Sequence, residues 1–291
     1  ENMPQRIIWL DATANQHVYE AVFERRAEVL DAYPQRKGHV YQITDRANGK
    51  TTLDPNVAGG SRRLEQTERV VQHIIESRGY KRPAIISYKK TIDAVESFKS
   101  LDNAHYYGAR GTNALEGCDA LFVVGTPMPP IDSIVEMAHM VFFDRMTPFN
   151  KTWASSIRGY NCRGSDGEWK GHETSAFLAD ADLDSLLWGL RNAEIIQAVH
   201  RARIINHEVD VWLLANTPIE ELPPDKLYSI QDVLGAPEGV DVFEWLTFWQ
   251  FAEEYKKRGQ CLTSVDVIDC LGVTKPTAIK YIKTLITDYG W

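Results

Sequence analysis

NAHYYGARGTNALEGCDALFVVGTP, residues Asn103–Pro127, is the stretch that indicates the fold class of this chain. We expect a strand ending at Tyr107, then a glycine-bearing loop, then a second strand over the apolar run Ala120–Gly125. A strand that is apolar along its whole length is buried on both faces, as in the middle of a parallel α/β sheet. The stretch therefore predicts an α/β fold with a mostly parallel sheet.

The loop between these two strands is a candidate site. Ligands of parallel sheets bind in the loops at the carboxyl ends of the strands, so the loop is expected to meet a phosphate or a nucleic-acid backbone there. Its candidate residues are Thr112, Glu116, Gly117 and Asp119. The alternative is an ordinary glycine-rich crossover loop of another kind of α/β enzyme.

A second motif, QAVHRAR over Gln197–Arg203, precedes another apolar strand expected over Val209–Ala215. We expect a helix that carries Gln197 and the two arginines, Arg201 and Arg203. The planar guanidinium fork of arginine suits phosphate binding better than the point charge of lysine. Gln197 and Arg201 lie one helical turn apart and so share a face, while Arg203 points elsewhere.

Together the two motifs resemble motifs V and VI of the second RecA-like lobe of superfamily 2 helicases. Thr112–Asp119 is similar to the threonine–glycine–aspartate loop, and Gln197 and Arg201 are similar to the glutamine and first arginine of a Q-x-x-G-R-x-x-R helix. His200 stands where the family has glycine, and the second arginine falls one residue early, at Arg203. In coarse order the resemblance covers residues 5–220.

Two weaker matches extend the resemblance. Arg6–Ala14, RIIWLDATA, is similar to motif III, although Asp11 replaces its serine; the alternative is an edge strand with a threonine helix cap. Pro83–Tyr88 is an expected buried strand, and its end resembles motif IV. There Ser87, Lys89 and Lys90 would contact phosphate oxygens without reading bases. A solvated strand end is the alternative.

The resemblance implies an ATP-dependent helicase or translocase with ATP and Mg²⁺ as cofactors, bound mainly by a first lobe that this chain lacks. It implies that Arg201 is the catalytic arginine finger, with Arg203 and Gln197 assisting, and that Glu116, Gly117 and Asp119 face the nucleotide. Thr112 would hold the nucleic-acid backbone with the motif IV residues. The sequence has no G-x-x-x-x-G-K-[ST] segment, so we do not expect it to hydrolyse ATP alone.

The domain organisation is expected to be the end of the first lobe over 1–15, the second lobe over 16–222 with an insertion at 128–191, a linker over 223–240 and a small domain over 241–291. Asn48-Gly49 predicts a hairpin turn within residues 40–53 rather than a P-loop. In the insertion, basic and aromatic residues suit either single-strand contact or simple covering of the lobe: Arg158, Tyr160, Arg163, Trp169, Lys170 and His172.

The C-terminal phrase LTSVDVIDCLGVTKPTAIKYIKTL resembles a winged helix-turn-helix. The expected core residues are Val267, Leu271, Ile279, Ile282 and Leu285. The expected nucleic-acid-binding residues on the exposed face of the recognition helix are Lys275, Thr277, Lys280 and Lys283.

Composition sets the remaining bounds. The chain has 291 residues, 44% hydrophobic and 25% charged, which is ordinary for a globular protein. Its apolar runs are too short for a membrane span, and we expect a cytoplasmic protein without a membrane partner. The four cysteines contain no C-x-x-C pair, which argues against a zinc site. The net charge of −8 still allows a local basic groove.

The expected partners are single-stranded or duplex nucleic acid, which we expect to be DNA, and the first helicase lobe in cis or in trans. One alternative is a DNA-binding regulator with a non-catalytic α/β domain and a winged helix. The other is a complete nucleotide-dependent enzyme with an unfamiliar phosphate site.

Overall fold

The computed structural model describes residues 8, 13, 15–30, 35–108, 115–163, 167–176 and 179–291. The chain forms two compact units, one of residues 1–64 with 79–227 and the other of residues 65–78 with 228–291. Each unit has its own buried hydrophobic cluster. The motif III-like residues Asp11 and Ala12, and Thr112 of the motif V-like loop, lie outside the described residues.

A six-stranded sheet organises the first unit, in the order β3-β2-β4-β7-β1-β8. The pairs β3–β2, β2–β4, β4–β7 and β7–β1 are all parallel. The strands are β1 (His39–Ile43), β2 (Pro83–Ser87), β3 (Asp102–His105), β4 (Ala120–Val124), β7 (Asp210–Leu214) and β8 (Lys226–Tyr228). The predicted α/β class with a mostly parallel sheet is therefore confirmed.

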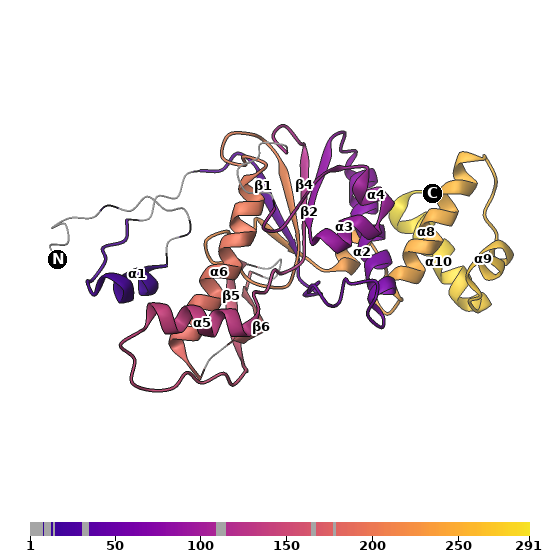
Figure 1. The fold of residues 1–291 in the computed structure, drawn as a ribbon. Coiled ribbons are helices and arrows are strands. Elements are labelled where there is room, and N and C mark those ends of the chain that lie inside the picture. Colours follow the sequence, from indigo (N-terminus) through magenta and orange to yellow (C-terminus); the bar gives the residue numbers. More distant parts are fainter. Residues whose placement is uncertain are drawn as a thin grey trace. The chain divides into compact units, whose positions relative to one another are not determined.

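β4 is the strand that the sequence placed in the middle of the sheet, and all five of its residues are buried. It pairs with β2 on one side and with β7 on the other. Figure 1 shows α6 (Ala181–His200) on one side of the strands, and α3 (Lys89–Ala94) and α4 (Glu96–Lys99) on the other. Helices on both faces exclude water from a strand that has no polar side.

Two expected local structures differ from the observed ones. Residues 44–53 form turns and open loop instead of a hairpin arm, and β1 pairs with β7 in parallel. Asn48 has a positive φ of 47°, and its Nδ2 donates to the Leu214 carbonyl at 3.0 Å, so this turn contacts the end of β7. The stretch expected as a linker contains β8 and α7 (Ile230–Leu234), which begins with a capping box at Ser229.

A helical subdomain belongs to the same unit. It contains α1 (Gln16–Phe23), α5 (Ile131–Val141) and the first half of α6 (Figure 1). Its core joins α5 to α6 through Ile134, Val135, Ala138, Phe142, Leu183, Leu186 and Leu187, with Val18 and Ala21 of α1 packed against it. Between α5 and α6, strands β5 (Ala154–Arg163) and β6 (Trp169–Ala176) form an antiparallel two-stranded sheet. The insertion thus contains a β-hairpin, of which residues 164–166 are not described.

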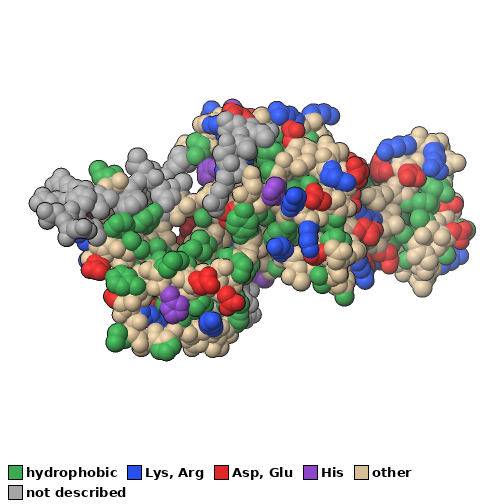
Figure 2. Space-filling model, viewed as in Figure 1, with side chains coloured by type: hydrophobic (Ala, Val, Ile, Leu, Met, Phe, Trp, Pro, Cys, Tyr) green, Lys and Arg blue, Asp and Glu red, His purple; other side chains and the backbone are tan. Residues whose placement is uncertain are grey.

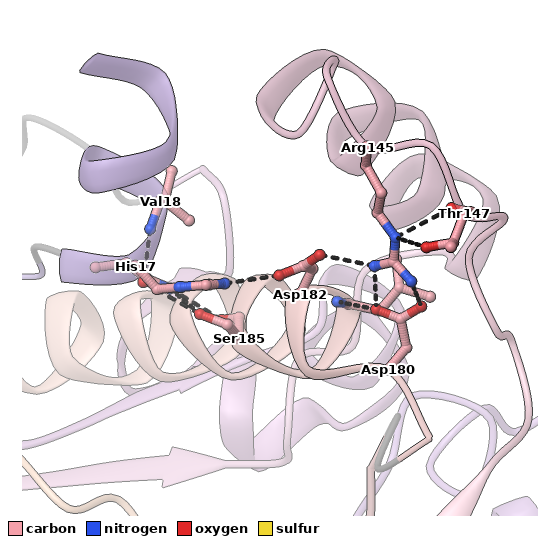
Figure 3. A network of polar contacts seen from close by, with 9 residues as sticks. His17, Val18, Arg145, Thr147, Asp180, Asp182 and Ser185 are labelled. Atoms are coloured by element: carbon pink, nitrogen blue, oxygen red, sulfur yellow. Dashed lines mark hydrogen bonds and ion pairs between the residues drawn. The ribbon is translucent and has the colours of Figure 1, made fainter. Parts of the chain in front are cut away.

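A charged network fixes the start of α6 (Figure 3). The Asp180 side chain is fully buried, accepts from the Leu183 amide as the N-cap, and pairs through both oxygens with Arg145 at 2.8 and 2.9 Å. Arg145 also reaches Asp182 at 2.7 Å, and Asp182 in turn lies 2.7 Å from His17 of α1. The network therefore connects α1, the segment after α5 and the first turn of α6.

The second unit is helical at its C-terminal end, with α8 (Val242–Lys257), α9 (Ser264–Leu271) and α10 (Lys275–Tyr289); α2 (Gly60–Arg78) contributes its later turns. The α9–α10 turn uses Gly272 at a φ of 66°, as the helix-turn-helix pattern predicted. Val267 and Leu285 are in the core, but Ile279 is 38% exposed, and Ala278 and Tyr281 are buried instead. No strand follows α10 among the described residues of this unit.

In the part of the chain that the structure describes, none of the helices has the length and apolar character needed to cross a bilayer.

Replacing Asp180 tests the network at the start of α6. Burial raises the pKa of Asp180, but hydrogen bonds from Arg145, Asn150 and Leu183 outweigh it and hold that pKa below its usual value. Asp180→Asn should lower the free energy of unfolding by about 3 kcal/mol at pH 7, because it leaves Arg145 without its buried partner. Urea denaturation measures the loss.

The matched control is Asp132→Asn, because Asp132 is 91% exposed and its pair with Lys151 spans 3.8 Å. It should change stability by less than about 0.5 kcal/mol. Since the folded-state pKa of Asp180 is depressed, its contribution is present above the unfolded pKa of about 3.9 and is lost as pH falls through the folded value. Equal effects of the two variants at pH 7 would contradict this role of Asp180.

Candidate functional site

Gln197 and Arg201 line one cavity in the first unit. The other lining residues are Ile86, Tyr106, Tyr107, Glu194 and Ala198. Gln197 lies in the last turn of α6, and Arg201 is its C-cap, with its backbone N–H donating to the carbonyls of Ala198 and Val199. The i, i+4 spacing puts both side chains on one side of the helix, as the sequence predicted. An amide and a guanidinium thus face the same space.

Two tyrosines of this cavity were not among the sequence candidates. The Tyr106 hydroxyl donates to the Gly125 carbonyl at 2.9 Å, and its backbone N–H donates to the Ser87 carbonyl at 3.0 Å. Burial raises the pKa of Tyr106 well above its ordinary value, so the phenol stays protonated and acts as a donor. Tyr107 has a positive φ of 65° and is 56% exposed. The signal in the sequence was the run Tyr106-Tyr107-Gly108, which directly follows β3.

Arg203 is separated from this cavity. Helix α6 ends at His200, and Arg203 has a positive φ of 52°. Its Nε lies 3.2 Å from Glu116 Oε2, and His207 Nε2 lies 3.7 Å from Glu116 Oε1. Both side chains of the Arg203–Glu116 pair are about two-fifths exposed, at 39% and 41%. The two arginines of the motif therefore have different neighbours.

Glu116, Gly117 and Asp119 lie at the amino end of β4, not at the carboxyl ends where the loop was expected. The loop leaves the carboxyl end of β3 and must return to the amino ends of the strands, because β3 and β4 both run parallel to β2. Asp119 accepts hydrogen bonds from the backbone N–H groups of Lys81 (2.5 Å) and Arg82 (3.1 Å). In this structure its carboxylate joins the starts of β2 and β4.

Ser87, Lys89 and Lys90 do follow the carboxyl end of β2, but only the lysines are accessible. Ser87 is fully buried, and its hydroxyl donates to the Val124 carbonyl at 3.0 Å. Ser87 therefore does not contact a nucleic-acid backbone in this conformation, which corrects the sequence expectation. Lys89 and Lys90 are exposed, and Lys90 Nζ lies 2.8 Å from Asp54 Oδ2. The hydrogen bond from Lys90 is the main cause of the lowered pKa of Asp54.

In the second unit, Lys275, Lys280 and Lys283 are exposed along α10, as expected for one face of the second helix of a helix-turn-helix. Lys280 Nζ approaches the Glu238 carbonyl at 3.4 Å. Thr277 is only partly exposed, and its hydroxyl lies 3.0 Å from that of Thr274. The lysines are thus better placed than Thr277 for contact with a phosphate.

Sequence reasoning missed a buried charged cluster on α6. Asp184, Trp188 and Arg191 recur at i, i+4 and i+7, so they share a face. The Arg191 guanidinium lies 3.8 Å from the Trp188 ring centroid and is 2% exposed. Burial lowers the pKa of Arg191 to about 10, although Asp184 opposes the shift. Arg158 of β5 covers this face through a 2.6 Å pair with Asp184.

The position of Asp119 generates a test of its role. Asp119→Asn should cost about 1.5–3 kcal/mol of stability, because it weakens two charge-assisted hydrogen bonds at the start of β4. Glu116→Gln removes only an exposed ion pair and should cost less than about 1 kcal/mol. Thermal or urea unfolding of the two variants measures the difference. If Asp119→Asn were as stable as the parent chain, the carboxylate would not have this structural role.

The sequence matches no family model and no curated protein. A solved structure titled "XPD_APO" is similar to this chain, with a TM-score of 0.41 and 13% sequence identity. The similarity covers 73% of this chain and 46% of that chain, so this chain spans less than half the length of the similar structure. A likeness this distant carries no functional argument.

Proposed function

We propose that this chain is the second-lobe portion of an ATP-dependent nucleic-acid helicase or translocase. One observation carries the proposal: Gln197 and Arg201, the two residues that match the motif VI pattern, line a single cavity beside the turn that opens the motif V-like loop. The cavity combines these two residues with Tyr106 and Tyr107, which precede the motif V-like loop, whereas Glu116 of that loop pairs with Arg203. A sheet that merely carried a regulatory domain would not require an amide and a guanidinium that face one cavity.

Two residues of the cavity carry donors of the kind that bind a phosphate group. Arg201 offers a planar guanidinium with several donors, and Gln197 offers a carboxamide N–H. ATP with Mg²⁺, held mainly by the first lobe in cis or in trans, would supply the phosphoryl group that is transferred to water. Arg201 would stabilise the charge that develops on the transferred group, and Gln197 would help to orient it. Glu194, which also lines the cavity, would oppose an anion and so favour a shallow approach.

The second arginine has a different role in this proposal. Arg203 is held by Glu116 at the amino end of β4, so it acts as an orienting residue for the motif V-like loop. Glu116, Gly117 and Asp119 then serve the nucleotide indirectly, by fixing the loop that carries Thr112. Direct contacts with ATP from these three residues stay a prediction from the resemblance.

The nucleic acid would cross the carboxyl ends of the strands, at Lys89 and Lys90 after β2 and at Thr112. The exposed lysines of α10 provide a second set of backbone contacts. Such contacts are independent of base sequence, because phosphates carry no sequence information. A DNA-binding regulator remains the second candidate, favoured by the exposed lysines on the second helix of the α9–α10 turn.

Arginine substitutions test the catalytic assignment. With the first lobe supplied, Arg201→Ala should reduce ATP turnover about 10³-fold while leaving nucleic-acid binding and folding intact, because a finger acts mainly on the transition state. Arg203→Ala should reduce turnover less, since its charge pairs with Glu116. Steady-state ATPase assays with and without single-stranded DNA make the measurement.

Arg258→Ala is the control, because Arg258 is 62% exposed and pairs with Glu254 one turn before it. It should leave turnover unchanged. Near-normal activity of Arg201→Ala together with loss in Arg203→Ala would reverse the two roles. If no arginine variant affected turnover, the regulator would become the better proposal.

Lysine substitutions test the strand path. Lys89→Ala and Lys90→Ala should each weaken binding of every sequence alike and flatten the dependence of log K on log salt by up to about 0.7–0.9, the value for one phosphate contact. Lys81→Ala is the matched control, since Lys81 is also exposed but lies at the opposite edge of the sheet. Fluorescence anisotropy over a salt series gives the slopes. Binding that ignores both substitutions would move the path away from β2.

A further inference from the structure

The β5–β6 hairpin has an inner face that contacts the rest of the unit. Arg158 pairs with Asp184 of α6 at 2.6 Å. The Tyr160 hydroxyl donates to the Asn216 carbonyl at 2.6 Å, and His172 Nε2 lies 2.7 Å from Asn216 Nδ2. Tyr160 is 2% exposed. These three side chains therefore anchor the hairpin to the rest of the unit.

The outer face carries a different set of side chains. Successive residues of a strand point to opposite faces, so Ile157 and Gly159 lie opposite to Arg158 and Tyr160. Ile157 is 80% exposed and Trp169 is 65% exposed. Arg163 is the cross-strand partner of Trp169, and its guanidinium carbon lies 4.7 Å from the indole ring centroid. Arg163 also donates to the Gly167 carbonyl at 2.8 Å, which holds the guanidinium in place.

Two glycines face each other between these side chains. Gly159 and Gly171 are cross-strand partners, between the Ile157 pair and the Arg163–Trp169 pair. A Cβ atom on Gly171 would lie 2.9 Å from the Arg158 carbonyl oxygen and 3.0 Å from the Ile157 side chain, so a larger residue does not fit without a shift. The outer face thus has the Ile157 side chain beside Gly171 at one end and the cation-stacked indole of Trp169 at the other.

The hairpin lies at the edge of the sheet that the proposed strand path uses. Asn216, which both Tyr160 and His172 contact, follows the carboxyl end of β7. Lys89 and Lys90 follow the carboxyl end of β2, and only β4 stands between β2 and β7. Two strand spacings amount to about 10 Å, a distance that a short run of nucleotides spans easily. The anchor of the hairpin after β7 and the two lysines after β2 therefore lie at the same ends of the strands.

We propose that the outer face of the β5–β6 hairpin binds single-stranded nucleic acid by stacking a base on Trp169, with Arg163 holding the indole and the neighbouring phosphate. The inference rests on the proposed function and extends its strand path. A base has an aromatic face whatever its identity, so stacking on Trp169 is sequence-tolerant. Ile157, which is 80% exposed, offers an apolar contact to the neighbouring nucleotide.

A nucleic-acid ligand fits this face better than a protein does. Protein interfaces need a contiguous apolar patch. In Figure 2, hydrophobic side chains gather over α1 and α5. On and just after α5, Met140 is 70%, Phe143 66% and Met146 96% exposed. The hairpin instead presents one ring with a fixed cation beside it, which is the combination that binds bases and phosphates together.

The test compares two probes on the full chain: a fluorescent oligo(dT), and an oligonucleotide of the same length whose sugars carry no bases. The parent chain should bind the oligo(dT) more tightly. Trp169→Ala should weaken oligo(dT) binding about 10- to 100-fold and leave binding of the abasic probe nearly unchanged, because only the stacking contact is lost. Trp169→Phe should retain most of the affinity.

Phe143→Ala is the matched control, since Phe143 is as exposed as Trp169 but belongs to the other surface. It should bind both probes like the parent chain. The proposal is overturned if Trp169→Ala binds oligo(dT) as the parent does, or if it weakens both probes equally. If Lys89→Ala and Lys90→Ala have no effect while Trp169→Ala abolishes the base preference, the hairpin site stands and the path beside β2 fails.

Discussion

The burial of β4 on both faces is the constraint on which the rest of the first unit depends. A strand without one polar side needs hydrogen-bonded neighbours along both edges and helices over both faces, because water cannot satisfy its backbone there. β2 and β7 supply the edges, and α6 lies on one side of the sheet with α3 and α4 on the other. Every candidate residue of this unit is attached to one of these elements or to a loop between them.

The parallel pairing of β3, β2 and β4 has a direct consequence for the site. A parallel neighbour can be reached only by a connection that returns from the carboxyl ends of the strands to their amino ends. The connection from β3 to β4 is of this kind, so its beginning and its end lie at different places. Tyr106 and Tyr107 at its beginning line the cavity with Arg201, whereas Glu116 at its end pairs with Arg203. Arg201 and Arg203, which are close in sequence, thus have different neighbours in the structure.

Helix α6 connects the functional candidates to the helical subdomain. Its 20 residues span about 30 Å. The Arg145–Asp180 pair fixes its start, and Arg158 of the hairpin contacts it at Asp184 in the first turn and at Trp188 further along. Gln197 lies in its last turn. Any ligand that moved the hairpin would act on the same rigid element that positions Gln197 and Arg201. The buried charges of its middle turns explain why this helix lacks the usual separation of polar and apolar faces.

The sequence by itself determined the elements whose signals are local. The apolar run of β4 predicted a central parallel strand, and the i, i+4 spacing of Gln197 and Arg201 predicted that they share one face of a helix. The capped helices around Gly272 produced the helix-turn-helix pattern.

Only the tertiary structure decided what depends on distant partners. Asn48 contacts Leu214 instead of turning a hairpin, and Ser87 is buried under the Val124 carbonyl. β8 joins the sheet from a stretch that was expected to be a linker. Hydrogen bonds between residues far apart in the chain do not produce a periodic pattern in the sequence. The position of Glu116 at the amino ends of the strands and the outward orientation of Trp169 therefore could not be deduced from it.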